Sequence, residues 1–527
     1  MNTVAAAPFS RLLVANRGEI AVRVIRACRE LGITTVTVYS EADAGARHVR
    51  LADEAVPLRG NTAAESYLDV GQIVAALRSS GAEAVHPGYG FLSENAAFAQ
   101  AVADAGAVFV GPPPAALDMM GDKLSARLAA EKAGVAVVPG TTVALADAAE
   151  VARFGDEFGW PVAIKAAFGG GGRGIRVVAS AAEARDAFAS AASEAEQGFG
   201  HAECYIERYL VWPRHIEIQV FADTHGRCVW LGERECSIQR RHQKLIEEAP
   251  APAFPDETRR AMGEAAVRVA EVAGYVGAGT VEFLYESGDG EDGAPGGSGV
   301  SPGNFWFLEM NTRLQVEHPV TEMVTGVDLV RAQVAIAAEG ALPLEQGDVV
   351  RRGHAIEARV YAEDAAANFL PQAGRALEVR WPRAPFVRVD RGIESGDEVP
   401  VHYDPILGKV VAFGTDRAAA LVRLAAALDE TLIHGVTTNL PFLRALVRAR
   451  EVERGAFDVE WIEREFLAGF AAVATAPAPE LALAAAALSE HLGAVDRGAT
   501  GAAGAAPGSR PADAFRDAGR WRLPGLE

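Results

Sequence analysis

The sequence predicts an α/β fold followed by an α+β unit, and three patterns along the chain support this prediction. Residues 11–39 contain a strand, a helix and a second strand in the order of a βαβ unit of a parallel sheet. Around residue 309, polar groups occupy every second position, as in a strand with one polar face. From residue 354 onward, strand-like runs accompany a helical run at 417–431. With 527 residues, half of them hydrophobic, the chain can form two to four domains and a large core.

The overall composition excludes several classes of function. A net charge of −20 argues against nucleic acid or an anionic membrane as the main partner, although a cleft can still carry a local basic pocket. The four cysteines show no short paired spacing suited to zinc, and their low number fits a reducing compartment. No apolar run reaches about 18 residues, and the first ten residues do not resemble a secretory signal. We therefore expect a cytoplasmic protein without a membrane span.

The first predicted domain is an open parallel sheet that ends near Asp122. Its strands are predicted at 11–15, 33–39 and 108–111, and a helix is predicted at 19–30 from its apolar periodicity. This order predicts a sheet whose strands are joined by helices.

The turns of this domain limit its chemistry. The turn after the first strand is Asn16-Arg17-Gly18-Glu19, which lacks the GxGxxG spacing of a dinucleotide site, so a nicotinamide enzyme is disfavoured. A second loop, His86–Glu94, leads into a helix that Glu94 or Asn95 is expected to start.

A glycine-rich tip is predicted between the strands 160–167 and 175–179. Gly169 to Gly172 are four consecutive glycines, which leave the backbone free to close over a phosphate chain but are also typical of a flexible linker. No GK[ST] sequence follows, so this is not a Walker loop. Lys165, on the strand face opposite Val162 and Ile164, favours a lid over phosphates.

The central segments give two contrasting patterns. Residues 214–220 predict a strand with one polar and one apolar face. Residues 233–244 are dense in charged and hydrogen-bonding groups, and their composition alone predicts a solvated loop.

Two carboxylates on neighbouring strands suggest a metal site. Glu309 begins an alternation of polar residues that runs to Glu317, with Leu308, Met310, Leu314 and Val316 between them. Because nine residues of straight strand would span roughly 30 Å, we expect the strand to end near Asn311 and then to curl around one pocket. If the strand 279–285 pairs with it, Glu282 faces Glu309, which is unfavourable unless a cation lies between them. Mg²⁺ would suit this position, with Asn311 adding an oxygen. A half-exposed hairpin with a polar outer face would show the same alternation.

The remaining segments predict a loop, a final unit and a tail. Residues 288–303 are rich in Gly, Ser, Pro and Asp, and we expect a disordered loop that joins the two carboxylate-bearing strands. The final α+β unit and the tail comprise the strands 355–361, 377–381 and 410–413, the helix 417–431, an alanine-rich helix at 480–492 and the linkers 471–479 and 498–511.

Taken together, these motifs resemble those of biotin carboxylase, the ATP-grasp component of biotin-dependent carboxylases, over about residues 10–465. The stretches that carry the resemblance are 14–21, 86–95, 120–123, 169–174, 232–244, 309–319 and 357–364. The resemblance reverses the interpretation of 233–244 as a plain loop. It implies an ATP-grasp fold with an N-terminal domain at 8–122, an ATP-grasp domain at 123–350 with a mobile lid at about 141–211, a C-terminal domain at 351–465, and a linker with the possible start of a further domain at 466–527.

The resemblance also implies roles for individual residues. ATP is expected to contact Lys123, Lys165, Gly171, Gly172, the hinge Glu207, Arg208, Tyr209 and Leu210, and further His215, Gln239, His242, Glu282 and Glu309. The family hinge reads Glu-Lys-Tyr-Leu, and Arg208 departs from it without effect if the backbone makes the contact. The expected ligands of Mg²⁺ or Mn²⁺ are Glu282, Glu309 and Asn311, and the expected bicarbonate site is Lys244, Arg313, Gln315 and Val316. Glu317 is the expected base, and Arg359 is expected to face biotin.

The implied reaction and partners follow from the same resemblance. It implies ATP-dependent carboxylation of biotin through carboxyphosphate, as the first half-reaction of a carboxylase that acts on an acyl-CoA. The chain has no Ala-Met-Lys-Met sequence, so biotin is expected on a carrier protein or on a further C-terminal part. The segment 519–523 resembles the point where acyl-CoA carboxylase α-chains continue. A carboxyltransferase subunit and a homodimer or larger complex are also expected. The alternatives are another ATP-grasp ligase, of the carbamoyl-phosphate or glycinamide-ribotide type, and an inactive scaffold subunit.

Overall fold

A computed structural model describes residues 9–141, 143–166, 175–199, 203–286, 304–474 and Leu488. The predicted glycine tip 169–174, the loop 288–303, the tail linkers and the end of the chain lie outside the described residues, and so does the predicted helix 480–492 except for Leu488. The chain divides into two units, Met1–Ala471 and Ala472–Glu527, and the elements below belong to the first unit apart from the last residues of α15 (Leu467–Ala474). In the described part of the chain, no helix is long and apolar enough to cross a membrane.

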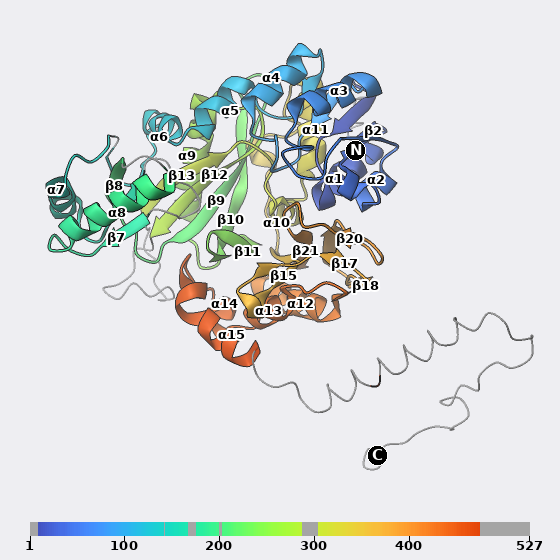
Figure 1. Ribbon diagram of the computed structural model, residues 1–527. Helices are drawn as coiled ribbons and strands as arrows, with labels where there is room; N and C mark the ends of the chain where they lie inside the picture. The colour runs from blue at the N-terminus through green and yellow to red at the C-terminus, as the bar shows by residue number, and fades with distance from the viewer. Residues whose placement is uncertain are drawn as a thin grey trace, which may run out of the picture. The chain divides into compact units, whose positions relative to one another are not determined.

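The N-terminal domain is the parallel sheet that the sequence predicts. Its strand order is β3-β2-β1-β4-β5, and every neighbouring pair is parallel. Asn95 caps the helix after the His86–Glu94 loop, because its side chain accepts a hydrogen bond from the Phe98 amide. The elements are β1 (Arg11–Val14), α1 (Gly18–Glu30), β2 (Thr34–Tyr39), α2 (Arg47–Leu51), β3 (Glu54–Pro57), α3 (Val70–Ser80), β4 (Ala84–His86), α4 (Ala96–Asp104), β5 (Val108–Phe109) and α5 (Pro114–Gly121) (Figure 1).

The centre of the protein is an eight-stranded sheet with the order β13-β12-β9-β10-β11-β14-β21-β19. All seven neighbouring pairs are antiparallel. The strands are β9 (Arg214–Ala222), β10 (Cys228–Arg240), β11 (Gln243–Ala249), β12 (Gly277–Glu286), β13 (Asn304–Asn311), β14 (His354–Tyr361), β19 (Val387–Arg391) and β21 (Ile406–Gly414). The accompanying helices are α6 (Lys123–Lys132), α9 (Asp256–Val272), α10 (His318–Thr325) and α11 (Leu329–Glu339).

The prediction of a solvated loop at 233–244 from composition alone is wrong. Residues 233–240 belong to β10 and are buried, and a two-residue turn at Arg241 and His242 leads directly into β11. Polar residues also fill one face of β9, but this face is buried like the apolar one. Charge therefore accumulates inside the sheet, where each group requires a partner.

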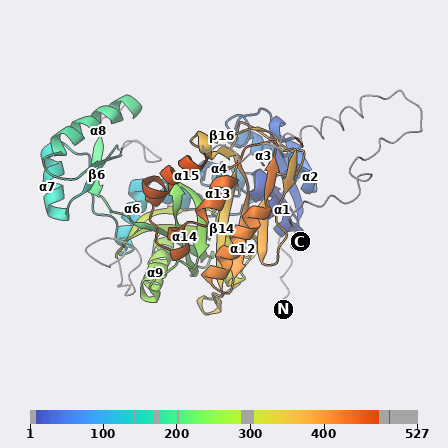
Figure 2. The same cartoon turned by 90° about the horizontal axis from the view of Figure 1, so that it is seen from below.

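A smaller sheet carries the predicted glycine tip. In Figure 2, α7 (Ala148–Phe158) and α8 (Ala184–Phe199) lie beside β6 (Val162–Ala166). The strand β6 pairs antiparallel with β7 (Ile175–Val178) and with β8 (Cys204–Arg208), and Lys165 is the register partner of Ile175. The pairing of β6 with β7 confirms the predicted hairpin on both sides of the tip.

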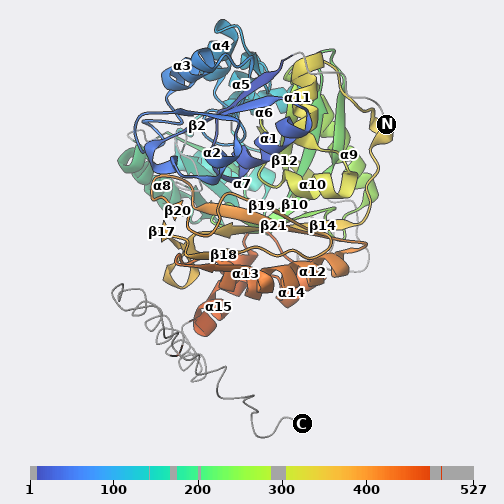
Figure 3. The same cartoon turned by 90° about the vertical axis from the view of Figure 1, so that its right-hand side faces the viewer.

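The C-terminal part covers one face of the strands β14 and β21. The helix α12 (Arg417–Glu430) packs on this face, and α10 lies on the opposite face of β14 (Figure 3). The predicted strands and helix after residue 354 are confirmed. The remaining elements are α13 (Leu440–Leu446), α14 (Arg450–Arg454) and the short strands β15 (Glu363–Asp364), β16 (Leu370–Pro371), β17 (Gly374–Arg375), β18 (Glu378–Arg380), β20 (Glu398–Val399) and β22 (Leu432–His434).

Candidate active site

A cavity of about 940 Å³ collects nearly all of the predicted site residues. Its walls come from the N-terminal turn at residues 16–20, the small sheet, the central sheet and the C-terminal part. Gly171 and Gly172 lie outside the described residues, and Glu317 is buried behind the wall. The predicted residues that line the cavity are Lys123, Lys165, Glu207, Arg208, Tyr209, Leu210, His215, Gln239, His242, Lys244, Glu282, Glu309, Asn311, Arg313, Gln315, Val316 and Arg359.

The two carboxylates that the sequence placed opposite each other are direct register partners. Glu282 of β12 pairs with Glu309 of β13, and the strand ends at Asn311 as expected. The predicted strict alternation fails at one point. A bulge leaves Leu308 as an extra residue between the pairs Glu282–Glu309 and Phe283–Phe307. Leu308 is therefore 42% exposed and lines the cavity instead of the core.

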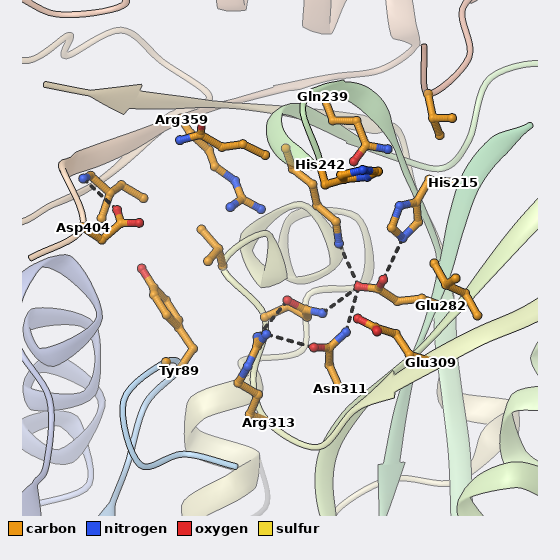
Figure 4. A pocket seen from close by; sticks show the side chains of 18 of the residues that line it. Tyr89, His215, Gln239, His242, Glu282, Glu309, Asn311, Arg313, Arg359 and Asp404 are labelled. Atoms are coloured by element: carbon orange, nitrogen blue, oxygen red, sulfur yellow. Dashed lines mark hydrogen bonds and ion pairs between the residues drawn. The ribbon is translucent and has the colours of Figure 1, made fainter. Parts of the chain in front are cut away.

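Glu282 is the centre of a converging set of donors, as Figure 4 shows. Its Oε1 accepts hydrogen bonds from Lys244 at 2.9 Å, Asn311 at 2.8 Å and Gln315 at 3.1 Å. The imidazole of His215 lies 2.9 Å from the other oxygen. Burial opposes ionisation, but the positive charges of Lys244 and His215 hold the pKa of Glu282 well below its ordinary value. Glu282 is therefore an anion at neutral pH.

Glu309 differs from Glu282 because its carboxylate faces the cavity with no hydrogen-bonding partner among the described residues. Loss of hydration and the negative charge of Glu282 both raise the pKa of Glu309. The amide oxygen of Asn311 accepts a hydrogen bond from Arg313 at 2.9 Å. Two adjacent carboxylates, one of them unpaired, form an oxygen-donor set that suits Mg²⁺ shared with nucleotide phosphates. The residues present thus fit the metal that the sequence implies.

Lys244 joins three carboxylates at one ammonium group. Its Nζ donates to Glu217 at 2.6 Å, Glu282 at 2.9 Å and Glu317 at 2.7 Å. Burial would lower the pKa of Lys244, but the three carboxylates raise it well above its ordinary value. The other oxygen of Glu217 is held by Arg234, which is fully buried and also binds side chains from neighbouring strands and α10.

Arg313 is held in a fixed orientation at the turn after β13. Its Nε donates to Glu94 at 2.9 Å, and its Nη1 donates to Gln315 at 2.9 Å. The other oxygen of Glu94 accepts from the Thr312 amide at 3.1 Å. Glu94 therefore does not start a helix, as was one option in the sequence, but fixes the arginine of the predicted bicarbonate site.

Glu317 and Arg359 form the far end of this network. Glu317 is fully buried at the start of α10, and its Oε2 accepts from Arg359 at 2.9 Å. Arg359 also donates to Glu247, and Figure 4 shows its guanidinium group extending toward the cavity. Burial opposes the shift, but Lys244 and Arg359 hold the pKa of Glu317 well below its ordinary value. By contrast, burial raises the pKa of Glu247 to about 7.

The opposite end of the cavity carries the predicted adenine hinge. Lys165 forms an ion pair with Glu207 on the adjacent strand β8. The Arg208 side chain binds both oxygens of Glu286 at 2.8 and 3.0 Å. It is therefore not needed for the predicted contact with adenine, which the backbone would make. The hydroxyl of Tyr209 donates to Glu460.

Several residues of the site escaped the sequence analysis. The wall opposite Glu282 includes Tyr89 and Asp404, which Figure 4 places on the far side of the cavity. Leu308 and Glu460 also line the cavity, and Glu247 positions Arg359. Of these, Tyr89 lay in a stretch that the motifs singled out, and Leu308 was named in the alternating stretch but as a residue between the polar positions. Asp404, Glu460 and Glu247 had no local signal.

The fold and the cavity together define the class. Paired strand carboxylates, two lysines and a hinge face one cavity, with a small sheet on one side, and this is the arrangement of an ATP-grasp ligase. The region 122–345 matches the family model described as carbamoyl-phosphate synthase L chain, ATP binding domain. Residues 8–117 match the biotin carboxylase N-terminal domain, and residues 357–464 match the biotin carboxylase C-terminal domain.

Relatives agree with these matches over most of the chain. The chain is 47% identical to "Biotin carboxylase" of Allochromatium vinosum, over 87% of this chain and 99% of the relative. It is 46% identical to "Propionyl-CoA carboxylase alpha chain" of Ruegeria pomeroyi, over 88% of this chain and 69% of the relative. Among solved structures, the biotin carboxylase domain dimer of Hydrogenobacter thermophilus 2-oxoglutarate carboxylase, in complex with MgADP, ADP and bicarbonate, is similar with a TM-score of 0.77. It is 42% identical, with 86% of this chain and 97% of that chain covered.

The chain belongs to the biotin carboxylase family and is an enzyme, an ATP-dependent ligase. The N-terminal and C-terminal domain models that match this chain are both biotin carboxylase domains, which argues against a carbamoyl-phosphate or glycinamide-ribotide enzyme.

Proposed function

We propose that this cavity carboxylates the ureido nitrogen of carrier-bound biotin, with ATP and bicarbonate as co-substrates and carboxyphosphate as the intermediate. The observation that carries the proposal is the single network in which Lys244 and Arg359 grip the carboxylate of Glu317 beside Arg313 and the Glu282–Glu309 pair. This network combines a base, two cations for an anionic substrate and a metal-type carboxylate pair within one cavity.

The bicarbonate site is assigned to the curled segment after β13. Arg313 presents a planar guanidinium group that suits two carbonate oxygens at once. Lys244, Gln315 and Val316 complete the site. Glu317 removes the proton of bicarbonate, because its ionised carboxylate lies beside the cations that hold the resulting charge.

The nucleotide is assigned to the other half of the cavity. The hinge from Glu207 to Leu210 contacts the adenine, with His215, Gln239 and His242 as further contacts. Lys123 and Lys165 neutralise phosphate oxygens, and Gly171 and Gly172 are further proposed contacts of the nucleotide. Carboxyphosphate is hydrolytically fragile, so the reaction requires that water be excluded from the cavity. Glu282, Glu309 and Asn311 would hold Mg²⁺, which would supply charge neutralisation at the nucleotide phosphates.

Biotin is assigned to the wall that carries Arg359. After carboxyphosphate breaks down to CO₂ and phosphate, the phosphate takes the proton of the ureido nitrogen. The Arg359 guanidinium then stabilises the enolate-like ureido oxygen, and Glu247 keeps the guanidinium in place.

The partners and the final acceptor follow from the reaction class. A biotin carrier and a carboxyltransferase complete the catalytic cycle of a biotin-dependent carboxylase. An acyl-CoA is the proposed acceptor, in line with the relative named propionyl-CoA carboxylase alpha chain. A dimer is proposed because the Hydrogenobacter domain is described as one. The cytoplasmic location and the domain boundaries stated above remain predictions.

The test is ADP release from ATP and Mg²⁺ with bicarbonate and free biotin present or omitted. The proposal requires that release depend on bicarbonate and increase with biotin, with transfer of ¹⁴C from bicarbonate to a biotinylated carrier. ADP release that depends on bicarbonate but does not change when biotin is added would instead indicate another carboxylate-activating ligase. A complete lack of metal-dependent turnover would indicate a scaffold subunit.

A further inference from the structure

Lysine is rare in this protein, and its positions are informative. Only five lysines, at 123, 132, 165, 244 and 409, stand among 50 basic residues. Three of them line the cavity, and Lys132 is exposed near the end of α6. The fifth, Lys409, is fully buried and has no role in the function proposed above. Because arginine serves nearly everywhere else, a buried lysine indicates a position where a compact ammonium group is needed.

Lys409 connects two walls of the cavity. It lies on β21 as the register partner of Arg359 on β14. Its Nζ donates to the backbone carbonyl of Val316 at 2.6 Å and lies 3.0 Å from Oε1 of Glu19. Val316 and Glu19 both line the cavity, and Glu19 also accepts the hydroxyl hydrogen bond of Tyr89. A continuous chain therefore runs from Tyr89 through Glu19 and Lys409 to the peptide that precedes Glu317.

We propose that Lys409 is a positioning residue for the bicarbonate segment 313–317, which it holds through the carbonyl of Val316. This inference rests on the assignment of that segment to bicarbonate in the proposed function. The bond fixes the orientation of the peptide between Val316 and Glu317, and hence the point from which the Glu317 side chain leaves the backbone. Lys244 and Arg359 hold the carboxylate, and Lys409 holds the backbone behind it.

The surroundings of Lys409 explain why arginine would not serve. Both acceptors lie within 3.0 Å of one nitrogen in a site with no solvent exposure. A guanidinium group spreads its donors over a wider plane and would displace one of these partners. The other ionisable groups near Lys409 are Glu357 from β14 and Asp390 and Arg388 from β19. Arg388 binds both oxygens of Asp390, and burial raises the pKa of Glu357 well above its ordinary value, so Glu19 is the carboxylate whose charge the ammonium group balances directly.

The experiment separates positioning from charge balance. Lys409→Met removes the bond to Val316 but leaves Glu19 as an uncompensated buried charge. The double variant Lys409→Met/Glu19→Gln removes one charge of each sign and still lacks the bond. Lys132→Met is the matched control, because it makes the same change on an exposed helix end. The readouts are the thermal midpoint, KM for bicarbonate and for ATP, and hydrogen–deuterium exchange of peptides that cover residues 313–317.

The proposal expects the double variant to regain most of the thermal midpoint while KM for bicarbonate stays at least tenfold above wild type. KM for ATP should change less than twofold, and residues 313–317 should exchange at least tenfold faster. A double variant with wild-type KM for bicarbonate and wild-type exchange would overturn the proposal. A double variant that cannot fold would also overturn it, because Lys409 would then stabilise the whole fold and not the bicarbonate segment in particular. The exchange measurement needs no turnover. The exchange measurement therefore tests the role of Lys409 even if the wild-type protein shows no bicarbonate-dependent ADP release. That absence of release would contradict the proposed function, not the role of Lys409.

Discussion

Replacing Glu317 with glutamine tests the chemistry of the site most directly. The Glu317 carboxylate accepts from Lys244 at 2.7 Å through one oxygen and from Arg359 at 2.9 Å through the other. Glutamine keeps the shape and one acceptor oxygen but turns an amide donor toward one of the two cations. Lys244 still keeps Glu217 and Glu282 as partners, so its charge remains compensated.

These contacts set the expected magnitudes. Losing one charge-assisted hydrogen bond in a buried site costs roughly 1.5–3 kcal/mol of folding free energy, which leaves a protein of this size folded. Loss of a general base lowers the rate by roughly 10²- to 10⁴-fold. The variant should therefore fold and bind ATP, because Glu317 lies behind the wall of the bicarbonate end.

The assay is bicarbonate-dependent ADP release, run beside binding of a non-hydrolysable ATP analogue. Glu322→Gln is the matched control, because Glu322 lies on the same helix α10 and its carboxylate binds Arg23 and Arg388 away from the cavity. We expect Glu322→Gln to lose stability without a comparable loss of turnover. Bicarbonate-dependent turnover of Glu317→Gln within tenfold of wild type would refute the assignment of Glu317 as the base.

Three further predictions concern acid stability, the Arg359 pair and the nucleotide end. Burial alone would raise the pKa of Glu248, but the positive charge of Arg417 holds this pKa at about 2. Glu248 therefore contributes about 3 kcal/mol of stability above pH 5, and this contribution is lost as the pH falls toward 2. The stability difference between wild type and Glu248→Gln, measured by urea unfolding, should therefore shrink between pH 5 and pH 3. Arg359→Met should lose roughly 3–5 kcal/mol in the same assay because two buried carboxylates lose their cation, and Glu247→Gln added to it should restore stability but not biotin-dependent turnover. Leu308→Ser should weaken binding of an ATP analogue about fivefold by calorimetry, since about 1 kcal/mol of apolar contact is lost.

Matched variants and contrary outcomes accompany these three predictions. Glu157→Gln changes an exposed carboxylate on α7 and should show no such pH trend. A constant stability difference for Glu248→Gln across that range would contradict the assigned pKa direction. Leu377→Ser changes a leucine that is 67% exposed and lies outside the cavity, so its ATP affinity should match wild type. Equal affinity of Leu308→Ser would remove Leu308 from the nucleotide site, and recovered turnover in the Arg359 double variant would remove Arg359 from catalysis.

The sequence predicted the parts of the fold that depend on local periodicity. The opposition of Glu282 and Glu309 followed from alternation on two strands that pair antiparallel, and the structure has this register. The end of the strand at Asn311 followed from the length of an extended chain compared with the size of a small-molecule site. The bulge at Leu308 could not be predicted, because an extra residue leaves the alternation of residue types unchanged while it reverses which side chain faces the cavity.

The hairpin at 233–244 shows what composition cannot indicate. A count of charged residues predicts exposure, but Arg234 has no solvent exposure and binds Glu217, Gln219, Thr280 and Thr321 from three other elements. Burial of charge is favourable only where partners from distant parts of the chain converge. Those partners can be identified only in the assembled sheet. From the sequence, the interpretation of 233–244 as a loop was reversed by the family resemblance alone.

The same network constrains how the substrates enter. An ammonium group has three N–H donors, and all three of Lys244 are used by Glu217, Glu282 and Glu317. If Lys244 binds bicarbonate as proposed, it does so only by giving up or sharing one carboxylate. Glu282 already accepts from Asn311 and Gln315 and lies 2.9 Å from the His215 imidazole, so it is the partner that Lys244 can release with least loss of pairing. The affinity for bicarbonate should consequently depend on whether a metal ion and nucleotide are bound at the Glu282–Glu309 pair. In the proposed assignment, the nucleotide half and the bicarbonate half of the cavity are linked by competition for the ammonium group of Lys244.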